Sequence, residues 1–155
     1  MKLITIALLV LLTTGCASNR SFESFQSVEL SQPQAQQITT DALSRIEANY
    51  APAKTVIDLQ QTKGLFGLEL ENQLRERGYG IEIPKTSKNG SEKTPVNSSA
   101  TKIRYEVKAY GPDNVLLVVQ GADGFQINRV YKKETNEGAL TPLTGISEIK
   151  ASNNE

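Results

Sequence analysis

The fold is decided by residues 55–83, which read TVIDLQQTKGLFGLELENQLRERGYGIEI. Residues 55–60 are rich in β-branched side chains and predict a strand. Apolar side chains at helical spacing predict a helix over 65–77, and strict alternation predicts a second strand over 79–83. Because a helix joins the two strands, the sequence favours a right-handed parallel crossover.

The predicted helix carries one apolar stripe, which comprises Phe66, Leu70 and Leu74. Glu71 and Arg75 form an i,i+4 pair on the opposite, exposed side. Gly78 is the expected C-terminal cap. We expect the stripe to pack against the apolar residues of the two strands, which are Ile57, Leu59, Ile81 and Ile83.

The flanking sequence adds a helix before this unit and a sheet after it. Residues 38–50 predict a helix that starts near Thr39 or Thr40 and ends before Pro52. Three strands follow near 103–109, 115–120 and 125–132, separated by turns, and form an antiparallel meander. The predicted fold class is therefore α+β, in two layers: a mixed sheet of about five strands, a parallel βαβ unit followed by the three-stranded meander, with two helices on one face.

The rest of the chain reads as flanking segments around one domain. Residues 1–15 predict a signal peptide, and the Ser- and Gln-rich residues 16–37 predict a flexible tether. The domain spans 38–134 and contains a loop at 85–100, and residues 135–155 form a polar tail. Phe22, Phe25 and Val28 recur every three residues in the tether, either by chance or as a segment that orders on a partner.

Composition excludes several classes of function. The 155 residues include 17 basic and 17 acidic side chains, one cysteine and no histidine. The balanced charge argues against nucleic-acid binding, and the absence of histidine removes the commonest catalytic base and imidazole-ligated metal sites. One cysteine allows neither an intrachain disulfide nor a thiolate zinc site.

The acidic residues give no catalytic arrangement. Glu69 and Glu76 share a helix face but lie about 10 Å apart along the axis, so we interpret them as solvated surface. Asp58 points away from the apolar side of its strand, so we place it at an edge or on an outer face. The glycines lack a phosphate-binding motif. We therefore expect no enzyme, no catalytic or metal-ligating residues and no cofactor.

The N-terminus carries an export signal. Lys2 precedes an apolar run of about ten residues, which is too short to span a bilayer and ends in Thr13-Thr14-Gly15-Cys16. A lone cysteine after small residues resembles the bacterial lipobox, although its usual leucine stands one place early, at Leu12. The resemblance implies cleavage before Cys16, acylation of this residue and, with Ala17 next, retention in the outer membrane. An ordinary signal peptide with an incidental cysteine is the alternative.

The combined motifs resemble a known family. A Tyr-x-Pro-Ala-(Arg/Lys)-Thr step is followed by an aromatic-Gly helix that ends Leu-Arg-x-x-Gly-Tyr, and both stand behind a lipobox. The matching residues are Tyr50, Pro52, Ala53, Lys54, Thr55, Phe66, Gly67, Leu74, Arg75, Gly78 and Tyr79. Together with Cys16 they are similar to TrbH, a small lipoprotein of conjugative type IV secretion systems. Ala51 and Lys54 depart from the commoner proline and arginine.

The resemblance implies a structural or assembly part of the mating-pair formation apparatus, with its domain facing the periplasm. Its partners would be membrane lipid, through acylated Cys16, and other proteins of the secretion core complex, without direct nucleic-acid contact. Homo-oligomer formation stays open. The alternative is an independent periplasm-facing binding module or inhibitor that docks on another envelope protein. For either function, the exposed side of the meander and residues 85–100 are the expected docking surfaces.

Overall fold

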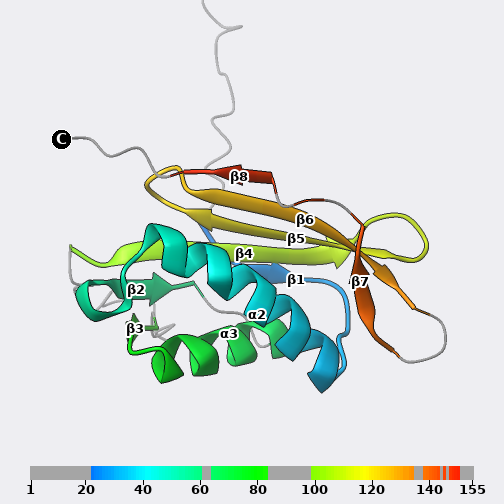
Figure 1. Cartoon of the computed structure of the whole chain (residues 1–155), viewed down its shortest axis with the longest axis horizontal. Helices are drawn as coiled ribbons and strands as arrows, with labels where there is room; N and C mark the ends of the chain where they lie inside the picture. Colours follow the sequence, from blue (N-terminus) through cyan, green and yellow to red (C-terminus); the bar gives the residue numbers. More distant parts are fainter. Residues whose placement is uncertain are drawn as a thin grey trace, which may run out of the picture.

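The computed structural model describes residues 22–60, 64–83, 99–134, 138–143, 145 and 147–150. Within them, two helices cover one face of an eight-stranded mixed sheet (Figure 1). The helices are α2 (Gln32–Asn49) and α3 (Leu65–Glu76), and a 3₁₀ turn, η1, spans Pro52–Lys54. The strands are β1 (Phe25–Gln26), β2 (Val56–Leu59), β3 (Gly80–Glu82), β4 (Thr101–Ala109), β5 (Asn114–Gly121), β6 (Gln126–Lys133), β7 (Leu140–Pro142) and β8 (Ser147–Ile149).

The sheet joins a parallel half to an antiparallel half. Its strand order is β3-β2-β4-β5-β6-β7, with β1 also paired to β4 and β8 also paired to β6. The β1–β4, β2–β3 and β2–β4 pairs are parallel. The β4–β5, β5–β6, β6–β7 and β6–β8 pairs are antiparallel. The predicted βαβ unit and meander are both present, and the α+β class is confirmed. The sheet is larger than the predicted five strands.

The core lies between the sheet and the helices. The predicted α3 stripe, Phe66, Leu70 and Leu74, is fully buried, as are Ile57 and Leu59 of β2. Ile81 is partly buried against this core. Ile83 is 38% exposed, so its predicted core position is wrong, because β3 ends at Glu82 and Ile83 lies beyond it.

Helix α2 starts earlier than predicted. Ser31 is its N-cap: its side chain accepts from the Gln34 amide, while the Gln34 side chain accepts from the Ser31 amide at 3.0 Å. This reciprocal capping box, together with Pro33 in the first turn, starts the helix at Gln32 rather than at Ile38. Further along, Asp41 ties α2 to β6 by accepting from Arg129 at 2.6 Å and from the Tyr131 hydroxyl at 2.5 Å.

Two flanking segments belong to the fold. The predicted tether over 16–37 is wrong for its described residues, because β1 pairs with β4 and α2 begins at Gln32. Val28 and Leu30 are buried in the core. The predicted loose tail over 135–155 is wrong for β7 and β8, which both pair with β6. Of the predicted 85–100 loop, only Ser99 and Ala100 are described.

Candidate functional site

The first part of the family motif lies at the junction between α2 and the β5–β6 turn. Tyr50 follows α2, and its hydroxyl donates to the Asp123 carboxylate at 2.9 Å from both oxygens. Its ring meets Phe125 edge-on at 5.2 Å between centroids. The Tyr79 hydroxyl donates to the Tyr50 carbonyl at 2.6 Å, so the motif's two tyrosines bind each other. They hold the end of α2 to the start of β3 and to the turn after β5.

Both tyrosines act as hydrogen-bond donors, and their raised pKa values keep the two phenols protonated. Burial raises the pKa of Tyr50, and the hydrogen bond and charge of Asp123 raise it further. Burial also raises the pKa of Tyr79 to about 12; Glu47 raises it as well, while Arg77 opposes the shift. Both phenols are therefore protonated at neutral pH, and neither is suited to act as a general base.

Gly121 allows the chain to approach this junction. A Cβ at this position would collide with the Tyr50 hydroxyl and with the Asp123 carboxylate. Asp123 also accepts from the Phe125 amide at 3.1 Å, which closes the turn. The sequence marked Asp123 only as a turn residue. Its link to Tyr50 spans most of the domain, so no local pattern reveals it.

The remaining motif residues have structural contacts or lie at the surface. Phe66 packs edge-on against Tyr105 at 4.9 Å, and Gly67 and Leu74 are buried in α3. Gly78 has φ of +86°, which confirms the predicted glycine cap. The 3₁₀ turn places Pro52 half-buried and Ala53 and Lys54 exposed; Thr55 donates to the Ala51 carbonyl, and Arg75 pairs with Glu71 at 3.0 Å.

Two carboxylates lie deeper than predicted. Glu69 is buried between the helices, where it accepts from Gln32 at 2.9 Å and from Gln73 at 2.7 Å, so its prediction as solvated surface is wrong. Asp58 points away from the helices, as expected, yet it is only 1% exposed and accepts from Gln60 at 2.7 Å. Burial raises the pKa of Asp58, although the charge of Lys102 opposes the shift.

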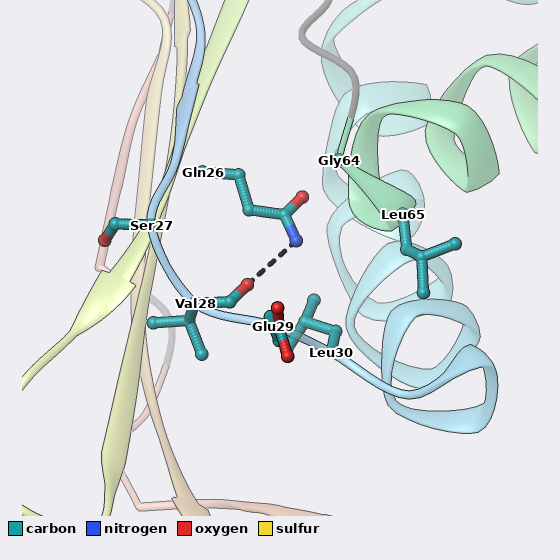
Figure 2. A pocket seen from close by; sticks show the side chains of 7 residues that line it. All are labelled: Gln26, Ser27, Val28, Glu29, Leu30, Gly64 and Leu65. Atoms are coloured by element: carbon teal, nitrogen blue, oxygen red, sulfur yellow. Dashed lines mark hydrogen bonds between the residues drawn. The ribbon is translucent and has the colours of Figure 1, made fainter.

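A cleft lies between the segment after β1 and the start of α3. Its volume is about 620 Å³, and its walls are Gln26, Ser27, Val28, Glu29, Leu30, Gly64 and Leu65. Figure 2 shows the Gln26 side chain reaching across from the sheet side toward α3. Its amide donates to the Val28 carbonyl at 2.9 Å and accepts from the Phe66 amide at 3.3 Å, which supplies the cap that Gly64 lacks. No local sequence pattern reveals the role of Gln26, because its partner Phe66 is forty residues away.

Two exposed leucines continue the surface beside this cleft. Leu65 is 38% exposed and Leu68, one turn further along α3, is 47% exposed. Exposed apolar patches rimmed by polar residues mark interaction surfaces. We call the cleft together with Leu65 and Leu68 the cleft surface.

The other exposed surface is the side of the sheet that faces away from the helices, here called the open sheet face. Alternation along β4 and β5 buries Tyr105, Val107, Val115 and Leu117 toward the helices and turns their neighbours outward. The register therefore places these apolar side chains on the open sheet face: Phe25, Tyr110, Leu116, Val118, Val130, Leu143 and Ile149.

The described residues contain no group of three or more acidic, cysteine or histidine side chains placed to hold a metal. In the same part of the chain, neither helix is long and apolar enough to cross a membrane. Cys16 lies outside the described residues, so its acylation stays a prediction from sequence.

Comparison with known proteins identifies the family. The family described as conjugal transfer protein TrbH matches residues 16–151. No curated protein matches the chain, and no solved structure does either. Because the family match spans most of the sequence and agrees with the motif that joins Tyr50 to Tyr79, the chain belongs to the TrbH family of conjugal transfer proteins.

Proposed function

We propose that this protein is an outer-membrane-anchored lipoprotein, with its domain in the periplasm, that acts as a structural or assembly component of a conjugative type IV secretion apparatus. The family match carries this proposal. It begins at Cys16, the residue at which a lipoprotein would start after cleavage. Two or more acyl chains at this position would make the anchor stable, since each buried methylene contributes about 0.8 kcal/mol.

The protein works by docking rather than by catalysis. The motif tyrosines are protonated donors that hold the fold together, and Glu69 is engaged by two glutamines. The cleft surface is the docking site for a protein of the apparatus, with Leu68 as an anchor that a partner pocket would bury.

The anchor is tested by Cys16→Ser. The wild-type protein should fractionate with the outer membrane, and mass spectrometry should find an acylated N-terminal cysteine. Cys16→Ser should release a folded protein and lower plasmid transfer, because residue 16 precedes the whole described domain. An unmodified mature chain that begins at another residue would contradict the lipoprotein assignment.

Docking is tested by Leu68→Glu, with crosslinking and co-purification in cells that carry the whole transfer system. This variant should keep its anchor and its fold but lose its crosslinked partner and its transfer activity. Glu76→Leu, which changes polarity on the same helix without removing an exposed leucine, is the control and should retain both. Capture of an unrelated envelope protein, together with normal transfer after gene deletion, would favour an independent binding module.

A further inference from the structure

The chain enters the domain on the open sheet face. Phe22 is the first described residue, and the Arg104 guanidinium lies 5.1 Å from its ring centroid. Arg104 alternates with the buried Ile103 and Tyr105, so its side chain is on the face away from the helices. Five residues lie between Cys16 and Phe22, so even a fully extended chain places these two residues only about 20 Å apart. An anchor at Cys16 therefore holds this side of the domain near the lipid.

The same face carries most of the exposed large apolar side chains of the described residues. Phe25, Tyr110, Leu143 and Ile149 lie on it, and each is more than half exposed. Only three other large apolar side chains of the described residues are exposed, and they lie on α3 or beyond the end of β3. Half-buried Leu116 and Val130, which are register partners, continue the apolar surface from Leu143, whereas Phe25 lies beside Glu106 and Ile149 lies beside Gln126. Contiguous exposed apolar surface marks a protein-binding or membrane-binding face.

Its charge distinguishes between these occupants. The outward positions of β4 and β6 carry Lys102, Arg104, Lys108 and Lys132. The acidic residues on the same face are Glu106, which pairs with Lys108 at 2.9 Å, Glu82 and the buried Asp58. Basic side chains are therefore in slight excess on the exposed part of this face. Basic groups close to an anionic lipid surface are attracted to it. Two copies that met through this face would instead bring like charges together. Basic and aromatic side chains around an apolar centre suit the interface between water and lipid.

We infer that the open sheet face lies against the anionic surface of the membrane that holds the acyl groups of Cys16. This inference rests on the proposed lipid anchor. It orients the domain so that the helices and Leu68 face away from the membrane, where a partner protein can reach them.

Single introduced cysteines test this orientation, because acylation blocks the thiol of Cys16 and the chain has no other cysteine. Leu143→Cys and Tyr110→Cys place a fluorophore on the open sheet face, and Leu68→Cys places one on α3 at similar exposure. The labelled, acylated proteins are reconstituted in phosphatidylglycerol vesicles that contain a headgroup-linked quencher lipid. Fluorescence should be quenched at positions 143 and 110 but not at 68. Replacing phosphatidylglycerol with phosphatidylcholine should weaken the quenching.

The other outcomes identify what fails. Acylated protein with equal quenching at all three positions, or with none at 143 and 110, would overturn the orientation while leaving the lipoprotein assignment intact. Label-to-label self-quenching at 143 that is independent of lipid would assign the face to a second copy. Protection of 143 only in cells that carry the transfer system would assign it to a protein partner. An unacylated Cys16 would overturn both proposals.

Discussion

The hydrogen bond between the two motif tyrosines allows a direct test of the structural role of the motif. Tyr79→Phe removes the hydroxyl that donates to the Tyr50 carbonyl at 2.6 Å and leaves the ring in place. Tyr79 is 4% exposed, so water does not replace the lost bond freely. Loss of a buried partner costs about 1–3 kcal/mol. At roughly 2–4 °C per kcal/mol, the melting temperature should fall by about 2–12 °C.

Tyr110→Phe is the matched control, because the same hydroxyl is removed from a side chain that is 56% exposed. Its effect should stay within about 0.5 kcal/mol, which is usual for surface substitutions. Both variants are compared with the wild type by urea and thermal unfolding, followed by far-UV circular dichroism. Equal losses of stability in the two variants would refute the assignment of Tyr79 as a structural donor.

The difference in stability between the wild type and Tyr79→Phe should also depend on pH, which gives a second measurement of the role of Tyr79. The pKa of Tyr79 is about 12 in the folded protein, above its ordinary value of 10. The protonated phenol therefore favours the folded state. Its contribution to the free energy of unfolding is complete below pH 10 and is lost as pH rises toward 12. The stability gap between wild type and Tyr79→Phe should narrow over this window. A gap that stays constant from pH 9 to pH 11.5 would show that the pKa is not raised.

Three further substitutions separate structural from surface roles. Leu70→Ala should lower the free energy of unfolding by about 2–5 kcal/mol, because Leu70 is fully buried. Leu68→Ala on the same helix should lower it by only a few tenths of a kcal/mol, because Leu68 is exposed. Equal shifts in the urea midpoint would mean that the buried face of α3 is misassigned. Gly121→Ala, whose methyl would collide with side-chain oxygens, should destabilise by about 1–3 kcal/mol, and Gly145→Ala, which has open space, should be nearly neutral by the same assay. Glu82→Gln should leave plasmid transfer unchanged in a mating assay, and abolished transfer with normal stability and assembly would instead indicate catalysis.

Elements with a strong local period could be predicted from the sequence. The β2–α3–β3 unit and the three-stranded meander follow from apolar spacing and turn residues. The start of α2 was missed although its signal is present, because Ser31 and Gln34 form a capping box around Pro33. The Ser- and Gln-rich composition of this region, which is typical of tethers, outweighed a two-residue capping signal.

The missed strands have a different cause. β1, β7 and β8 are only two or three residues long, so none of them carries enough alternation to be recognised. These short segments become strands because they pair with β4 or β6. The same limit applies to the junction at Tyr50 and to the cap at Gln26, since each depends on a contact between residues far apart in the sequence.

Strand β1 is also the first described element after the proposed anchor at Cys16. Any pull on the N-terminus is transmitted to the sheet through two paired residues, the bond from the Ser27 amide to the Val107 carbonyl and the one from the Tyr105 amide to the Ser24 hydroxyl. Burial of Val28 and Leu30 in the core and the bond from the Phe66 amide to Gln26 add to these contacts, so the segment before α2 is held to the domain along its length. With Cys16 acylated as proposed, a pull from the membrane would therefore reach the sheet before it reaches α2.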